Sequence, residues 1–357
     1  MDISAGLLGD FFKTNSSAVC FSTAAGAVSL NQDIRVSVGG LLRKYLSGAT
    51  VVLPALSAGT DYAIYACSDG TLQASANFSA PAGYTTANSR RIGGFHYAPG
   101  GNATGYNTGG DTTPAINPFS IWDLKWRPAC PDPRGMALVA GRFWADIYLC
   151  GTDVDANGTS RNAVKIGDGS SPPKVPAMFG GDGSTTYGSF TWFEAAELMA
   201  SAGKQLLSYD EFVAAAYGTK EAVSRGRDAV TTGLGTSNAG STSTDENFTS
   251  RWGLMQVSGC MHQWGRDFIS KLVVPASPAD ATALATSINT FTGRANTDGR
   301  GSLYLPGSDD GIAAALFGAA WSSASDAGSR ASLWSVKPWH SSGFIGARGR
   351  SDHLAHV

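Results

Sequence analysis

The C-terminal forty residues, GAAWSSASDAGSRASLWSVKPWHSSGFIGARGRSDHLAHV (318–357), set residues that folds depend on among a chemically mixed group. Between Ala320 and Asp326 the even-numbered residues alternate with Trp321 and the other odd-numbered residues. A period of two separates the faces of an extended segment. We interpret the stretch as a rigid frame that carries replaceable side chains, which indicates a binding surface. The simpler alternative on these residues alone is a Ser- and Gly-rich surface loop.

The composition limits the fold class and the partners. The chain of 357 residues is long enough for two or more domains, and its 43% hydrophobic content is adequate for packed cores. Only 15% of residues are charged and 45 are glycine, which predicts many turns and short strands with little helix. A net charge of -2 gives no electrostatic basis for binding nucleic acid or an anionic membrane.

The cysteines and the N-terminal residues indicate the cellular compartment in which the protein assembles. The 5 cysteines are widely spaced and form neither a CxxC pair nor a zinc pattern, which indicates reduced thiols and assembly in the cytoplasm. The start, MDISAGLLGDFFK (1–13), has neither the basic region nor the cleavage site of a secretory signal. No run of about twenty apolar residues predicts insertion into a membrane. Action outside the cell would therefore need another exit, such as release by lysis.

The first third of the chain carries β-sheet signals. Segments at 34–40 and 48–56 predict strands, and Asp69–Gly70 between two apolar runs predicts a hairpin. Prolines crowd the segment RPACPDPRG (127–135), where we place the domain boundary. We therefore predict an antiparallel β-sandwich-like domain over residues 1–127.

The second predicted domain covers residues 128–357. Residues 137–150 predict a strand, and Asn157–Gly158 predicts a hairpin turn. Two helices follow, because Thr191 and Ser208 each begin a capping box with a glutamate three residues later. Short strands and loops rich in Trp and Gly make up the rest. The chain is therefore predicted to be α+β without a βαβ repeat.

Candidate catalytic and metal motifs are weak. DVDANG (153–158) begins like a calcium loop, but its twelfth position is Val164 in place of Glu, so we prefer the hairpin turn. Cys260 and His262 could supply a nucleophile and a base, yet we interpret them as packing around Trp264. No GxSxG, dinucleotide-binding or P-loop spacing occurs. The sequence predicts neither an enzyme nor a cofactor, and it leaves a structural metal undecided.

Six segments resemble the major tropism determinants of phages. They follow one another in the family's order, and the resemblance covers nearly the whole chain. The segments are PALSAGTDYAIYACSDGTLQASANFSAPAGYTTANSRRIGGFHYAPG (54–100), WDLKWRP (122–128), DPRGMALVAGRFWADIYL (132–149), FGGDGS (179–184), SRWGLMQVSGCMHQWG (250–265) and GARGRSDHL (346–354).

The resemblance implies a fold and a function. Members of this family are receptor-binding variable proteins of diversity-generating retroelements, act as homotrimers at phage tail-fibre tips and carry a C-type-lectin-like domain, which formylglycine-generating enzymes share. We therefore expect a lectin-like domain over 128–357 that binds a host-surface protein or glycan from the virion tail fibre. We also expect the chain to begin at the sandwich-like domain, without the family's additional N-terminal β-prism-like domain.

The resemblance also implies which side chains bind the ligand. In the family an adenine-mutagenised template rewrites selected codons while the scaffold stays fixed. Aligned on the scaffold residues Trp321, Arg330, Gly346 and Arg348, the positions that correspond to variable ones are Ala320, Ser322, Ala324, Asp326, Leu333, Ser335, Val336, Lys337, His340, Ser342, Phe344 and Ile345. We expect these twelve positions to be exposed.

Other roles for these residues stay open on the sequence alone. Leu333, Phe344 and Ile345 would ordinarily be core residues, whereas the charged positions and His340 would be ordinary surface residues. Trp339 matches a position that the family does not vary, but an exposed tryptophan would be a natural ligand contact.

Two rival functions come from the same fold. SRWGLMQVSGCMHQWGRD (250–267) also resembles the tryptophan-rich segment of formylglycine-generating enzymes, but no cysteine follows Cys260 to supply their C-terminal cysteine pair. A calcium-dependent sugar lectin would carry an EPN or QPD loop and a WND strand, and this sequence has none of them. A fixed lectin-like adhesin without diversification is the other alternative.

Overall fold

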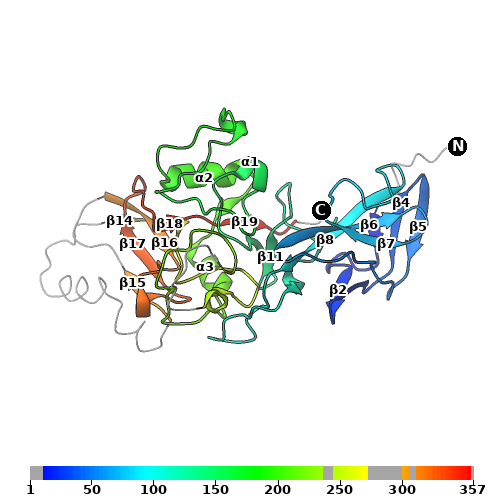
Figure 1. Cartoon of the computed structure of the whole chain (residues 1–357), viewed down its shortest axis with the longest axis horizontal. Helices are drawn as coiled ribbons and strands as arrows, with labels where there is room; N and C mark the ends of the chain where they lie inside the picture. The colour runs from blue at the N-terminus through cyan, green and yellow to red at the C-terminus, as the bar shows by residue number, and fades with distance from the viewer. Residues whose placement is uncertain (1–10, 236–243, 272–299, 305–310, 355–357) are drawn as a thin grey trace, which may run out of the picture. The chain divides into compact units, whose positions relative to one another are not determined.

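The computed structural model describes residues 11–235, 244–271, 300–304 and 311–354. Strands make up most of the regular secondary structure of the described chain, with a few short helices (Figure 1). None of the described helices is long and apolar enough to cross a membrane. The chain divides into two compact units, which consist of residues 1–99, 114–136 and 352–357, and of residues 100–113 and 137–351. The domain limits 1–127 and 128–357 stay a prediction.

The first unit consists of antiparallel sheets. Its elements are β1 (Phe11–Lys13), β2 (Phe21–Ala24), β3 (Ala27–Leu30), β4 (Ile34–Val38), β5 (Leu41–Tyr45), β6 (Thr60–Cys67), β7 (Leu72–Ser75), β8 (Ser89–Ala98), β9 (Ala115–Ile116), the 3-10 helix η1 (Pro118–Ser120) and β10 (Trp122–Asp123). The strand orders are β1-β4-β5, β10-β8-β6-β7 with β9 beside β8, and β2-β3.

Two strand predictions for this unit are confirmed and one is wrong. The hairpin at Asp69–Gly70 joins β6 and β7, and Gly70 adopts the left-handed conformation that the turn needs. Strand 34–40 is present as β4, whose alternate residues are buried. Residues 48–56 form no strand and make only isolated bridges, at Thr50 and Val52.

The second unit combines two sheets with short helices. Its elements are β11 (Met136–Val139), β12 (Phe143–Asp146), α1 (Val154–Asn157), η2 (Ala177–Phe179), α2 (Trp192–Ser201), β13 (Gln205–Leu206), α3 (Tyr209–Ala215), η3 (Asp245–Phe248), β14 (His262–Lys271), β15 (Leu303–Tyr304), β16 (Gly311–Phe317), η4 (Ala324–Asp326), β17 (Ser332–Val336), β18 (Ile345–Gly346) and β19 (Gly349–Asp352). The strand orders are β11-β12-β19-β13 and β15-β17-β16-β14-β18.

Both predicted helices of this unit are confirmed. α2 starts after Thr191 and α3 starts after Ser208, and each start has a complete capping box. The caps satisfy backbone N–H groups that have no partner within the helix. α2 buries Leu198 and Met199 in a core that also contains Trp264 of β14.

One strand prediction and one turn prediction for this unit are wrong. Residues 137–150 contain two strands, β11 and β12, joined by a turn in which Ala140 and Gly141 both have positive φ. Asn157–Gly158 ends α1, whose first turn is capped by the Asp153 side chain, and does not form a hairpin.

Candidate functional site

Arg348 fastens the C-terminal segment to the interior of the second unit. Its Nε donates to Oε1 of Gln263 at 2.9 Å. Nη1 donates to the carbonyl oxygens of Asp146 and Ile147, at 2.6 and 2.8 Å, and Nη2 donates to the carbonyl oxygen of Met255 at 2.5 Å. Burial lowers the pKa of Arg348 to about 10, so the guanidinium is still charged at neutral pH. One side chain thus joins β12 and β14 to the start of β19.

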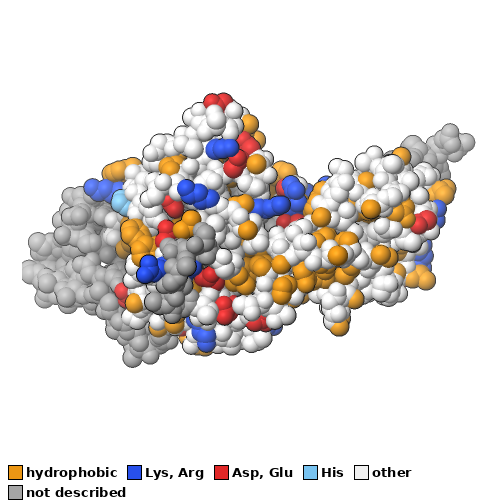
Figure 2. Space-filling view, in the orientation of Figure 1, with side chains coloured by type: hydrophobic (Ala, Val, Ile, Leu, Met, Phe, Trp, Pro, Cys, Tyr) orange, Lys and Arg blue, Asp and Glu red, His pale blue; other side chains and the backbone are white. Residues whose placement is uncertain are grey.

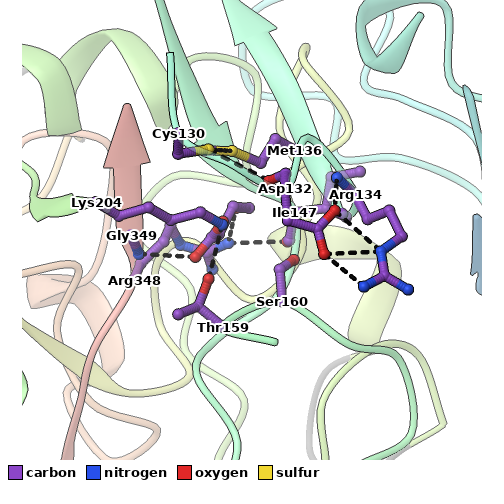
Figure 3. A network of polar contacts seen from close by, with 12 residues as sticks. Cys130, Asp132, Arg134, Met136, Ile147, Thr159, Ser160, Lys204, Arg348 and Gly349 are labelled. Atoms are coloured by element: carbon purple, nitrogen blue, oxygen red, sulfur yellow. Dashed lines mark hydrogen bonds and ion pairs between the residues drawn. The ribbon is translucent and has the colours of Figure 1, made fainter. Parts of the chain in front are cut away.

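A buried ion pair lies beside this anchor (Figure 3). Nζ of Lys204 donates to Oδ1 of Asp146 at 2.5 Å and to Oγ1 of Thr159 at 2.7 Å. The backbone N–H of Gly349 donates to Oδ2 of the same aspartate at 3.1 Å. The carboxylate is therefore satisfied by one cation and one backbone donor, which offsets the cost of burying its charge.

A third anchor holds the middle of the segment. Oε2 of Glu221, which is buried, accepts from the N–H of Ser329 at 2.8 Å, and Oε1 accepts from the Ser329 hydroxyl at 2.6 Å. Gly328 lies against the same glutamate, where a Cβ would clash. Further along, the N–H of Trp192 donates to the carbonyl of Pro338 at 3.0 Å. The backbone is thus fixed at several points between the predicted variable positions.

The twelve predicted positions differ in exposure. Those that are exposed are Ser322, Ala324, Lys337, His340 and Phe344. Those that are half-buried are Asp326, Leu333, Ser335, Val336 and Ser342. Those that are buried are Ala320 and Ile345. The expectation of exposure is therefore wrong for the last two.

Strand pairing explains why these two side chains are buried. Ala320 forms a bridge with Cys260, and its exposed fraction is 4%. Ile345 pairs with His262 as the first residue of β18, belongs to the core around Trp264 and is 3% exposed. A substitution at either position would act on packing before it acted on a ligand.

The segment after Ala320 is folded differently from the prediction. Residues 320–326 form a turn followed by η4, so the alternating faces of an extended strand are absent. Ala324 has a φ of 47°, which an extended strand does not contain. Trp321 is only half-buried, and its ring lies 5.2 Å from that of Phe344 between centroids. Trp321 therefore packs beside a predicted variable residue and contributes less to the core.

Two hollows flank this turn. One has a volume of about 300 Å³, and its lining includes Asp326 and Leu333 together with His262. The other is wide and shallow, and its lining includes Ser322 and Ala324 together with Trp321. The structure thus brings four predicted positions to the walls of two adjacent depressions.

Four further predicted positions lie in β17 or within four residues after it, namely Ser335, Val336, Lys337 and His340. Nζ of Lys337 lies 5.8 Å from the ring centroid of Trp339, whose side chain is 60% exposed. The N–H of His340 donates to the carbonyl of Lys337 at 2.9 Å, which closes the turn. Figure 2 shows histidine, basic and hydrophobic side chains near one another over the region where Figure 1 labels β14 and β17. Val336 packs against the core that contains Trp264.

The four predicted scaffold residues differ in burial. Gly346 and Arg348 are buried, and Gly346 pairs with Gln263 in β18. Arg330 is half-buried, as is Trp321. Sequence reasoning missed the partners that do most of the anchoring, which are Asp146, Lys204, Glu221 and Gln263.

The chemistry available at this surface is recognition by side chains. All five cysteines are free and buried. Burial raises the pKa of Cys260 well above its ordinary value, which keeps the thiol protonated and unreactive. Among the described residues no group of three or more His, Cys, Asp or Glu side chains is arranged to hold a metal ion. Aromatic, hydroxyl and charged side chains on an anchored backbone can supply contacts to a ligand.

Comparison with known proteins identifies relatives over almost the whole chain. The family described as Mtd second domain matches residues 18–123. The tail fiber receptor-binding protein of Bordetella phage BPP-1 is 48% identical over 346 residues, which are 96% of this chain and 84% of that protein.

Solved structures give the same result. The P3c variant of the major tropism determinant is 48% identical with a TM-score of 0.82, over 96% of this chain and 86% of that one. The M1 variant is 46% identical with a TM-score of 0.83, over 97% of this chain and 86% of that one. The resemblance seen in the sequence is confirmed, and the chain belongs to the major tropism determinant family of phage tail-fibre receptor-binding proteins.

Proposed function

We propose that this protein binds a receptor on the host surface through the predicted variable residues of segment 320–345, and that a diversity-generating retroelement rewrites their codons. The observation that carries the proposal is that the side chains and the backbone of this segment have separate roles. Ten of the twelve side chains are exposed or half-buried, whereas the buried Glu221 holds the backbone between them at Ser329 and Arg348 anchors the chain just after them.

This division has a physical consequence. A surface can accept many side chains without unfolding only where those side chains do not hold the fold. The buried contacts of Arg348 and of the Lys204–Asp146 pair supply the stability instead. Substitutions at Ser322, Lys337 or His340 would therefore change recognition at little cost in folding free energy.

The proposal includes a fold and an assembly. The first domain would be β-sandwich-like over 1–127, and the second would be C-type-lectin-like over 128–357. A homotrimer at the tip of a tail fibre would present three copies of the surface to the host. Several weak contacts would then combine through effective concentration, so a modest affinity at each surface suffices for attachment.

Adsorption of purified protein to the strain that the carrying phage infects tests the receptor-binding role. The triple variant Lys337→Ala, His340→Ala, Phe344→Ala removes three exposed side chains of the segment, and we expect it to lose most of the adsorption. The matched control is Arg142→Ala, Met178→Ala, Phe179→Ala, which removes exposed side chains of the same unit outside the segment. Equal adsorption by the two variants would contradict the proposal.

A further inference from the structure

The hollow beside η4 has a mixed lining. Its polar residues are His262, Ser302, Ser323, Asp326 and Ser332, and its apolar residues are Ala319, Ala331 and Leu333. Only Asp326 and Leu333 belong to the predicted variable positions. Six of the eight described lining residues are therefore positions that diversification would leave unchanged, and two are positions that it would change.

His262 brings an unused hydrogen-bonding atom to this hollow. Its Nδ1 is buried and has no hydrogen-bond partner among the described residues. Burial lowers the pKa of His262 to about 4, so the ring is neutral at physiological pH. A neutral imidazole offers one donor and one acceptor, and leaving either one buried without a partner is unfavourable. The histidine is thus ready to pair with a group that enters the hollow.

The other polar residues are held in place by the fold. The Ser302 hydroxyl donates to Oδ1 of Asp326 at 2.6 Å, and the Ser302 N–H donates to the carbonyl of the same aspartate at 2.9 Å. The Ser332 hydroxyl accepts from Nε1 of Trp334 at 3.1 Å. The Ser323 hydroxyl accepts from the N–H of Ala320 at 3.1 Å. A hydroxyl can make more than one hydrogen bond, so these groups can also bind a ligand.

We propose that this hollow is a subsite for one neutral, hydroxyl-bearing ring, such as a single hexose of a host-surface glycan, with His262 as its fixed polar contact. The inference rests on the proposed receptor-binding function and names the class of group that would enter this part of the surface. The side chains at positions 326 and 333 then select among rings by their substituents.

Size and charge argue for this class of ligand. A volume of about 300 Å³ is at the lower end of the range for small-molecule sites, so it fits one ring and no folded polypeptide. The Asp326 carboxylate repels acidic rings, which favours a neutral one. The hydroxyls and the imidazole match the hydrogen bonds of a polyol, while Ala319 and Leu333 face its C–H groups.

Saturation-transfer NMR on the full chain with glucose, galactose, mannose and glucuronate as probes measures binding directly. We expect saturable binding of at least one neutral hexose and none of glucuronate. His262→Phe should weaken that binding about tenfold, whereas His262→Gln, which keeps a hydrogen-bonding group, should stay within about threefold. Met178→Phe places the same ring at an exposed site outside the hollow and should leave binding unchanged.

Asp326→Asn tests the selection by the variable wall, because removing the charge should admit glucuronate. A crystal of the protein soaked in the bound hexose should show the sugar against His262. The inference is overturned if no neutral hexose binds saturably, if the wild type binds glucuronate equally well, or if the soaked crystal shows only ordered water at Nδ1. These results leave the adsorption experiment untouched, so failure of the subsite and failure of the receptor-binding surface are distinguishable.

Discussion

Nζ of Lys204 lies 2.5 Å from Oδ1 of Asp146, and both side chains are buried beside the backbone of Gly349. Lys204→Met would leave the carboxylate buried without its cation. Losing one partner of a buried pair costs about 3–5 kcal/mol. We expect a loss of this size in the free energy of unfolding measured with urea. Lys174→Met is the control, because its partner Asp153 is partly exposed, and it should cost at most about 1 kcal/mol. Equal losses of unfolding free energy in the two variants would show that the buried Lys204–Asp146 pair stabilises the fold no more than the partly exposed pair does.

Glu221 should control the order of the segment without touching a ligand. Glu221→Ala removes the acceptor for the N–H and the hydroxyl of Ser329, so amide hydrogen exchange at Ser329 should become faster. Adsorption should also weaken, because the predicted variable side chains on either side would no longer be held in one arrangement. Unchanged exchange at this amide would mean that other contacts fix the segment.

Trp339 should be a ligand contact although it lies outside the twelve predicted variable positions. Its side chain is 60% exposed and lies beside Lys337. Removing it should therefore cost little folding free energy, and its ring offers a large apolar area to a ligand. Trp339→Ala should reduce adsorption by about 2 kcal/mol and leave the melting temperature unchanged. A drop in melting temperature with normal adsorption would assign Trp339 to the fold.

The backbone at Ala324 should favour glycine. Its φ of 47° is costly for a residue with a Cβ, so Ala324→Gly should stabilise the protein by about 0.5–1 kcal/mol and Ala324→Val should destabilise it. Thermal unfolding of both variants measures these changes. Ala196→Gly, within α2, is the control and should destabilise by about 1 kcal/mol. A destabilising Ala324→Gly would contradict the strained backbone.

His262 should make the stability depend on pH below neutrality. Burial lowers the pKa of His262 from its ordinary value of 6.5 to about 4, so between these values the unfolded chain binds a proton that the folded chain does not. This contribution to stability is therefore complete above pH 6.5 and falls as the pH drops to about 4, by up to about 1.4 kcal/mol for each unit of pH. His262→Gln should flatten the curve in this window, as measured by urea unfolding at several pH values. Parallel curves for wild type and variant would refute the lowered pKa.

Local signals predicted the parts of the fold that local interactions determine. The capping boxes at Thr191 and Ser208 identified α2 and α3 because a cap involves only neighbouring residues. The hairpin at Asp69–Gly70 was predictable for the same reason. The turn at Ala140–Gly141 was missed, because alanine rarely adopts the positive φ that this turn requires.

Contacts between distant residues explain what the sequence could not predict at the site. Whether Ala320 and Ile345 are exposed depends on pairing with Cys260 and His262, far away in the chain. The alternation after Ala320 suggested a strand, but the Ser224 hydroxyl donates to the carbonyl of Trp321 and accepts from the N–H of Ala324, which holds the segment in a turn. The family resemblance predicted which positions are variable, and only the structure could show which of their side chains face outward.

Sequencing the 3′ end of this gene in many sister clones, together with any nearby imperfect repeat, tests the central claim most directly. The account predicts substitutions that cluster at the codons of the twelve aligned positions and arise at adenines of the repeat. At Ala320 and Ile345 it predicts only side chains that fit the core. An invariant 3′ end without a repeat would contradict diversification and leave a fixed adhesin.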